Sequence, residues 1–132
     1  TASLEMAQAL ARLGSWSLDL ETNTVERSRQ MYALLGRDPL LGPPAYTGAR
    51  STAYVDEDAE WLYQAMKRAI SEGAAFSGTV RLRLPHEGVA VLRAEAKVLH
   101  DSAGKPTRIY GTVMDITASV ERERALQQEA VA

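Results

Sequence analysis

The spacing of apolar residues changes several times along the chain. Within residues 4–13 apolar side chains recur at helical spacing and Gly14 follows as a stop signal, which predicts a short amphipathic helix. Residues 15–20 then alternate, with Trp16 and Leu18 on one face and polar side chains on the other. This alternation predicts a half-buried strand.

A hairpin and a short helix are predicted next. Four polar residues follow the first strand and include an asparagine, which tight turns tolerate, so residues 25–28 can return as the second strand. Ser28 is placed to cap a helix over residues 29–35, which Gly36 ends. Residues 37–50 contain several prolines and glycines, which predicts a long loop.

The longest helix in the core is predicted to begin near Asp56 or Asp58, whose carboxylates can accept backbone N–H groups of its first turn. Its apolar stripe includes Trp61 and Met66 and ends at Gly73. Three strands are predicted after this helix, and the turn-forming residues between them favour antiparallel pairing. These strands cover residues 76–84, 89–100 and 107–116.

The last segment, residues 118–130, reads as a charged helix that Thr117 can cap. Its notable apolar side chains are only Val120, Ala125 and Leu126. Because so few apolar groups are available, little drives this helix back onto a core, and we expect it to flank the domain.

Composition and charge narrow the possible functions. A chain of 132 residues with 45% hydrophobic residues fits one compact domain. The net charge of -2, with both signs interspersed, offers no basic surface for nucleic acid or an anionic membrane. No apolar run is long enough to span a bilayer, and no signal peptide is recognisable. The absence of cysteine excludes disulfides and thiolate nucleophiles and suits the cytoplasm, which is the expected location.

Several strings resemble those of PAS domains from sensor kinases and cyclic-di-GMP enzymes. Residues 14–19 are similar to the family's Gly-x-Trp-x-Trp-Asp string, with Leu18 in place of the second Trp and Asp19 at the end. Residues 28–36 resemble the Ser-x-x-x-Tyr-x-Leu-x-Gly stretch, and residues 111–117 resemble the closing Gly-x-x-x-Asp-Ile-Thr.

One further hairpin is similar to the family's strings, and two positions differ from them. Arg81 and Gly88 fall where the family's Arg-x-x-x-x-x-Gly hairpin has them, and Gly104 follows in the next turn. Only Asp58 remains of the usual His-Pro-x-Asp, and Leu92 stands where the family commonly has Trp.

The resemblance covers nearly the whole chain and implies an α+β fold of PAS type. A five-stranded antiparallel sheet would carry helices on one face, with a flanking helix at each end. The chain begins with Thr1 and ends in an uncapped helix, so we expect flanking domains in a longer polypeptide. The expected parts are an N-terminal amphipathic flanking helix at 1–13, a PAS core at 14–117 and a C-terminal output or linker helix at 118–132.

The concave face of such a sheet could enclose a ligand or be filled by large side chains. Alternation places small or medium residues inward on the last two strands, which leaves room there. A small molecule could occupy that room, or Trp16, Phe76 and Trp61 could fill it. The candidate pocket-lining residues are Trp16, Trp61, Met66, Leu92, Ala94, Ala96, Gly111 and Val113, and the candidate polar groups of a sensor are Tyr32, Tyr54 and Arg81.

The cofactors known in the family are only partly compatible with the sequence. Haem-binding members supply an axial histidine from the long helix, and residues 58–72 contain none, so haem is disfavoured. Covalent flavin needs a cysteine, and the chain has none. Flavin held without a covalent bond near Trp16, an unknown small molecule and no ligand at all stay open. We expect His86 and His100 at the surface, and acidic residues 56–60 to stabilise a helix start rather than hold a metal.

The sequence offers no basis for catalysis. We find no Ser-His-Asp arrangement, paired carboxylates or Gly-rich phosphate loop in a suitable setting, so the domain is not expected to be an enzyme in its own right. The resemblance implies a sensory domain of a bacterial signalling protein, a sensor histidine kinase first and a diguanylate cyclase next. Two modes stay open, a ligand-gated sensor and a ligand-free module for dimerisation and relay.

The resemblance also implies where a signal would leave the domain. Asp115, Ile116 and Thr117 join the last strand to the exit helix and form the expected relay, to which Asp19 is also assigned. The two flanking helices carry apolar faces that one subunit leaves uncovered, so a parallel homodimer is expected, with the effector domain in the same chain. The outer sheet residues offered to the partner's N-terminal helix are Tyr110, Thr112 and Met114.

Overall fold

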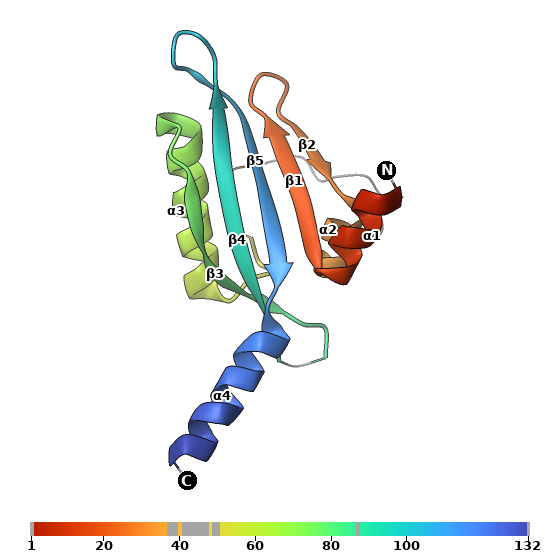
Figure 1. Ribbon diagram of the computed structural model, residues 1–132. Helices are drawn as coiled ribbons and strands as arrows, with labels where there is room; N and C mark the ends of the chain where they lie inside the picture. Colours follow the sequence, from red (N-terminus) through yellow and green to blue (C-terminus); the bar gives the residue numbers. More distant parts are fainter. Residues whose placement is uncertain (1, 37–39, 41–47, 49–50, 87, 132) are drawn as a thin grey trace.

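The computed structural model describes residues 2–36, 40, 48, 51–86 and 88–131. A sheet with helices behind it forms the body, and one helix projects away at the C-terminal end (Figure 1). The elements in chain order are α1 (Ala2–Leu10), β1 (Leu13–Asp19), β2 (Thr24–Arg27), α2 (Arg29–Leu35), α3 (Asp56–Glu72), β3 (Phe76–Arg83), β4 (Val89–His100), β5 (Pro106–Asp115) and α4 (Thr117–Val131).

The five strands form one antiparallel sheet in the order β2-β1-β5-β4-β3. This confirms the expected fold class. Helices α2 and α3 lie on one face of the sheet, where α2 contacts β1 and α3 contacts β3 and β5 (Figure 1). One inward-facing row crosses four strands through Trp16, Gly111, Ala96 and Phe76, each opposite the next.

The N-terminal helix is shorter than predicted, and the stop at Gly14 is wrong. Helix α1 ends at Leu10, and Leu13 already belongs to β1, where it pairs with Met114. Gly14 lies inside the strand. Glycine is favoured at this position because a Cβ would stand 2.8 Å from the Cα of Met31 in α2. The chain instead reverses at Arg12, whose φ of 54° is left-handed.

The short helix α2 agrees with its predicted limits and caps. The hydroxyl of Ser28 accepts the N–H of Met31, and Gly36 ends the helix with a left-handed φ of 69°. The long loop predicted over residues 37–50 lies outside the described residues except at Leu40 and Gly48.

Helix α3 begins at Asp56, but the predicted carboxylate cap is wrong. Its N-cap residue is Val55, which makes no side-chain capping bond. The carboxylate of Asp58 turns away from the helix and accepts the N–H of Arg81 in β3 at 2.7 Å. The predicted end is confirmed, since Gly73 follows Glu72 with a φ of 70°.

The three C-terminal strands match the prediction to within one residue at each end. Their alternation is also confirmed, because Leu92 and Ile109 are fully buried while Arg93 and Tyr110 are exposed. The exit helix α4 begins at Thr117, and every side chain from 121 to 130 is exposed. None of the described helices is long and apolar enough to cross a membrane.

The interior is divided into two apolar clusters under the sheet. One includes Met31, Tyr54, Leu82 and Val113, and the other includes Leu18, Ala69 and Ile109. The side chain of Trp16 packs against both clusters. A single aromatic residue on β1 therefore connects the two halves of the core.

Candidate functional site

The eight residues expected to line a pocket all come from elements that face the interior. Leu92, Ala94, Ala96 and Val113 are buried there, and from α3 the side chain of Trp61 packs against one apolar cluster and that of Met66 against the other. The predicted lining residues are therefore spread over two clusters, and Trp16 packs against both. The contacts of the two tryptophans, both partly buried, show how part of the described interior is packed.

Trp16 lies over Gly111, the residue opposite it on β5. A Cβ at Gly111 would come within 3.0 Å of the indole atoms Cε2 and Cζ2 of Trp16 and would collide with the backbone carbonyl oxygen of Glu95. Glycine is thus required for the close approach of the indole and the neighbouring strand. The space that a side chain at position 111 would take is occupied.

Trp61 uses a second glycine in the same way. A Cβ at Gly78 on β3 would stand 2.6 Å from the indole atom Cη2 of Trp61. The Trp61 ring also meets Phe76 edge-on, with ring centroids 5.9 Å apart and an interplanar angle of 87°. These contacts pack α3 against β3 and fill the space between them.

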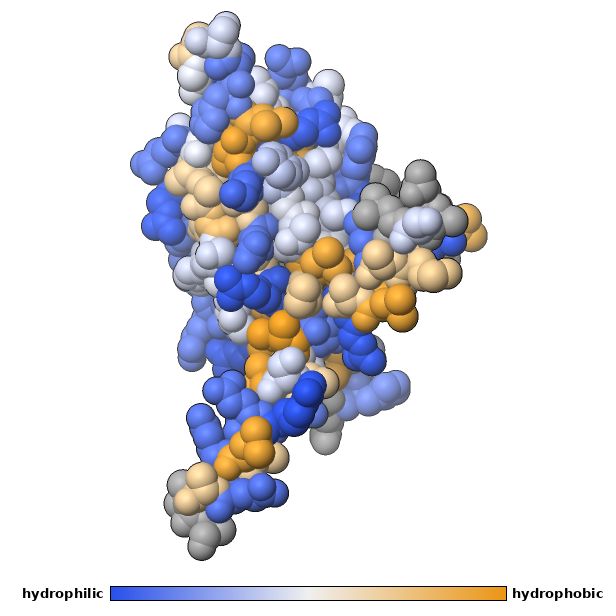
Figure 2. All heavy atoms as spheres, in the orientation of Figure 1, coloured by the Kyte–Doolittle hydropathy of each residue, from blue (hydrophilic) through white to orange (hydrophobic). Residues whose placement is uncertain are grey.

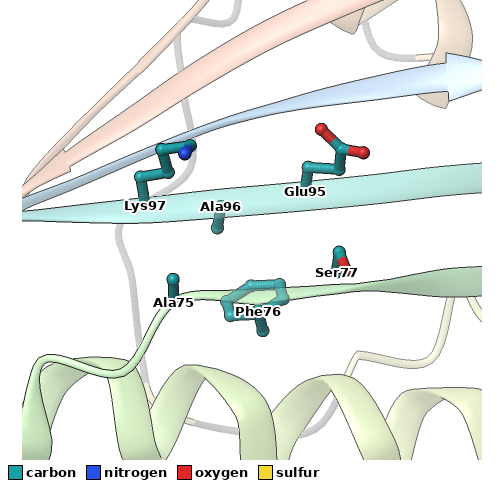
Figure 3. A pocket seen from close by; sticks show the side chains of 6 residues that line it. All are labelled: Ala75, Phe76, Ser77, Glu95, Ala96 and Lys97. Atoms are coloured by element: carbon teal, nitrogen blue, oxygen red, sulfur yellow. The ribbon is translucent and has the colours of Figure 1, made fainter.

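A shallow depression of about 340 Å³ lies outside this interior, at the start of β3. Figure 3 shows Phe76 and Ala96 pointing toward α3, whereas Ser77, Glu95 and Lys97 point to the opposite side. Of the eight predicted pocket residues, only Ala96 lines this depression. It is therefore a feature of the sheet surface and does not correspond to the predicted pocket.

Of the three polar candidates of a sensor, two are buried tyrosines and the third lies on the edge strand of the sheet. Tyr32 and Tyr54 are buried, and burial raises the pKa of the Tyr54 phenol, with the positive charge of Arg27 opposing that shift. Arg81 lies at the edge of the sheet with 43% of its side chain exposed. Among the described residues no charged side chain is buried, so the described interior offers no acid–base pair.

The Arg81 guanidinium is bound by the Asp58 carboxylate at the start of α3. Nε lies 2.8 Å from Oδ2 and Nη2 lies 3.1 Å from Oδ1, so the contact is bidentate. The side-chain hydrogen bond from Arg81 lowers the pKa of Asp58 below its ordinary value, and the backbone N–H of Arg81 acts in the same direction. This pair joins the first turn of α3 to β3 at the edge of the sheet.

Arg83, two residues further along β3, makes similar contacts with the segment before α3. Its guanidinium donates to the carbonyl oxygens of Thr52 and Tyr54 and to the carboxylate of Asp56. Backbone bonds between residues 53–55 and β3 extend the sheet edge at the same place. The segment that leads into α3 is thus bound to β3 both by backbone hydrogen bonds and by the Arg83 side chain.

The predicted output junction is tied to β4 through Thr117. Its hydroxyl oxygen accepts the N–H of Val91 at 2.9 Å and donates to the Asp115 carboxylate at 2.6 Å. The same carboxylate oxygen accepts the N–H of Thr117, and the N–H of Ile116 donates to the carbonyl of Val91. Thr117 therefore links the first turn of α4 to the strand, a contact beyond the simple helix cap that the sequence predicted.

Asp19 is not brought together with these residues. It pairs with Arg108 at the far end of β5, and its carboxylate accepts the N–H groups of Glu21 and Thr22 in the hairpin turn. The length of β5 separates it from Asp115. In this structure Asp19 shapes the β1–β2 turn.

Sequence reasoning missed the contacts that join distant segments. The pairing of Arg81 with Asp58 and the fit of Trp61 against Gly78 were not predicted. A glycine inside a strand is a usable signal, because it often marks a close approach of another group. Gly78 carried that signal, whereas nothing in a single sequence specifies which carboxylate meets which arginine.

Neither histidine belongs to a candidate metal site. Both side chains are exposed, as predicted, and the imidazole of His100 lies against Gly73 at the end of α3. Within the described ranges no group of three His, Cys, Asp or Glu residues is arranged to hold a metal ion.

Comparison with known sequences agrees with this geometry. A family model described as PAS fold matches residues 24–113. The sensor protein FixL of Bradyrhizobium diazoefficiens is 28% identical over 117 residues, which cover 87% of this chain. The chain spans only 22% of the length of FixL.

Solved structures show the same architecture. A sensory box histidine kinase/response regulator from Burkholderia thailandensis superposes with a TM-score of 0.69 at 20% identity, covering 96% of this chain and 94% of that one. The N-terminal domain of a diguanylate cyclase with PAS/PAC sensor from Marinobacter aquaeolei gives a TM-score of 0.61 at 20% identity, covering 81% and 97%. At such identities the likeness concerns the fold alone.

Proposed function

Because the chain belongs to the PAS-fold family, we propose that it relays a signal through α4 within a bacterial multidomain signalling protein and has no catalytic role of its own. The observation that carries the proposal is the junction at Thr117. Three hydrogen bonds of its hydroxyl and N–H groups join β4, the end of β5 and the first turn of α4. A change in the pairing or twist of β4 and β5 would therefore move the start of α4.

The relay is proposed to work without a small molecule in the described interior. The support is that Trp16 occupies the space over Gly111 and Trp61 the space over Gly78. A ligand-gated sensor is the alternative, and it would require these indoles to give way. Native mass spectrometry of chain purified without refolding should give the mass of the polypeptide alone. A retained small molecule would contradict the ligand-free mode while leaving the relay through α4 intact.

The parent protein is proposed to be a cytoplasmic sensor histidine kinase, with a diguanylate cyclase as the second candidate. FixL is named a sensor protein, and the Burkholderia structure is a sensory box histidine kinase. The Marinobacter structure supports the second candidate. Activity assays of the full-length protein with ATP and with GTP would separate the two.

A homodimer is the proposed assembly. Outward residues of β1, β4 and β5 near the start of α4 are apolar, including Leu13, Val91 and Met114, and α1 adds exposed Met6 and Leu10. Figure 2 shows orange residues from α1 across this part of the outer face to the start of α4. Exposed apolar patches of this kind commonly mark interfaces. Light scattering that gives only monomer at every concentration would contradict the dimer.

The relay is tested at Thr117 with two substitutions. Thr117→Val removes the hydroxyl and leaves the Val91 N–H without its partner, which should loosen the first turn of α4. Thr117→Ser keeps the hydroxyl and is the matched control. The chain has no cysteine, so spin labels at Lys97→Cys and Leu126→Cys report the position of α4 relative to the sheet. We expect a broader distance distribution for Thr117→Val only, and equal distributions would contradict the relay.

A further inference from the structure

The backbone at Arg12 is unusual and lies between α1 and β1. Its φ of 54° is left-handed, and Asn23, with a φ of 56°, is the only other described non-glycine residue in that region. Asparagine adopts this conformation comparatively readily, whereas an arginine there is uncommon and must be held by its surroundings. The conformation directs the Arg12 carbonyl oxygen to the N–H of Asp115, at 3.1 Å.

The partner of Arg12 is the residue that also positions α4. Asp115 ends β5, and its carboxylate binds both the hydroxyl and the N–H of Thr117, the first residue of α4. The turn after α1 is therefore two hydrogen bonds from the start of α4. Figure 1 shows α1 beside the first residues of β1 and α4 leaving β5 at the same end of the sheet.

The strand that follows Arg12 is fixed against α2. Gly14 is packed so closely on Met31 that a Cβ would stand 2.8 Å from its Cα. The N–H of Ser15 donates to the Ser28 hydroxyl, and the N–H of Ser28 donates to the carbonyl of Ser15, both at 2.9 Å. A displacement of α1 cannot be absorbed by β1 without breaking these contacts, so it acts on Arg12.

We propose that the Arg12–Asp115 hydrogen bond couples α1 to α4, so that a displacement of α1 shifts α4 without rearrangement of the interior. This inference rests on the proposed relay through α4 and adds its input. The interior then serves as a rigid support, in keeping with the two closely packed indoles. Input and output helices are joined at one end of the sheet by the main-chain bond between Asp115 and Arg12 and by the Asp115 carboxylate, which binds Thr117.

The test replaces Arg12 with proline. Proline holds φ at about −65°, so Arg12→Pro is incompatible with the left-handed conformation and moves the carbonyl away from Asp115. Asn23→Pro introduces the same conflict in the β1–β2 turn, far from α4, and is the matched control. We expect at least a tenfold faster exchange of the Asp115 amide proton in Arg12→Pro, relative to the most protected amides of the same variant. The control should leave this ratio unchanged.

A second measurement covers the case in which Arg12→Pro does not fold. Arg12→Gly keeps the left-handed conformation accessible but loosens it. Spin labels at Met6→Cys and Leu126→Cys should then give a broader distance distribution than in the parent chain. Unchanged Asp115 exchange in folded Arg12→Pro, or an unchanged distribution in Arg12→Gly, would overturn the coupling. Because the Thr117 substitutions do not involve Arg12, such a result would leave the relay through α4 standing.

Discussion

The carboxylate of Asp58 binds Arg81, which lies 23 positions later in the sequence. Two guanidinium bonds and one backbone N–H converge on it, and only 16% of its side chain is exposed. Such charge-assisted hydrogen bonds are stronger than neutral ones, and they strengthen further where water is excluded. The pair therefore ties α3 to β3 at the edge of the sheet.

Replacing Asp58 with asparagine should lower the free energy of unfolding by about 1–2 kcal/mol at pH 7. The pKa of Asp58 is lowered in the folded chain, so its contribution is present above its unfolded pKa of about 4 and is lost as the pH falls through the folded value. Urea titrations between pH 7 and pH 3 should show the parent chain and Asp58→Asn converging at low pH.

The control for this experiment is Asp56→Asn. Asp56 also pairs with an arginine, but 94% of its side chain is exposed, so the change should cost less than about 1 kcal/mol. A parallel offset between the parent chain and Asp58→Asn across the whole pH range would contradict the role assigned to the Asp58 charge.

The two glycines under the indoles should respond differently to alanine. At Gly111 the obstacle includes the backbone carbonyl of Glu95, which cannot move without disturbing the sheet. At Gly78 the obstacle is the outer edge of the Trp61 ring, which can tilt. We expect Gly111→Ala to cost about 3 kcal/mol and Gly78→Ala about 1–2 kcal/mol in urea unfolding. The reverse order would show that the indoles, and not the strand spacing, limit the fit.

At the scale of elements, local sequence signals specified most of the architecture. Alternation along β4 and β5, and the glycines at 36 and 73 after their helices, fixed the limits of those elements. β1 begins two residues before its predicted start, because tertiary contact with Met31, and not a helix end, selects glycine at position 14. Contacts between distant elements depend on geometry that a single sequence does not display.

The hydroxyl of Ser28 connects β1 with α2 and provides a test at this scale. It accepts the N–H of Met31 in α2 and the N–H of Ser15 in β1. Ser28→Ala leaves both groups without that acceptor and should lower the free energy of unfolding by about 2 kcal/mol. Ser71→Ala removes an exposed hydroxyl that only donates to the Lys67 carbonyl, so it should change stability by less than about 0.5 kcal/mol. Equal effects in chemical unfolding would mean that Ser28 does not join β1 to α2.

At the scale of the whole molecule, the apolar core and α4 are separate parts of the chain. The core lies between the sheet and helices α2 and α3, whereas α4 projects from one end with its side chains 121–130 exposed (Figure 1). Helices of this length are marginal in water when they lack packing partners. An ordered α4 would therefore gain most of its stability from contact with another surface, which the proposed dimer supplies.

Removing residues 121–132 separates folding from assembly. The truncated chain should keep the free energy of unfolding of its monomer to within about 0.5 kcal/mol, because every described side chain lost as far as 130 is exposed. If α4 packs against its counterpart in the dimer, the dimer should dissociate at a concentration at least tenfold lower in the intact chain than in the truncated one. Sedimentation equilibrium over a range of concentrations measures the dissociation constants of the intact and the truncated chain, and urea unfolding measures their stability. The same dissociation constant for both chains would place the dimer contact on α1 and the outer sheet face alone, and α4 would then be held by its junction at Thr117.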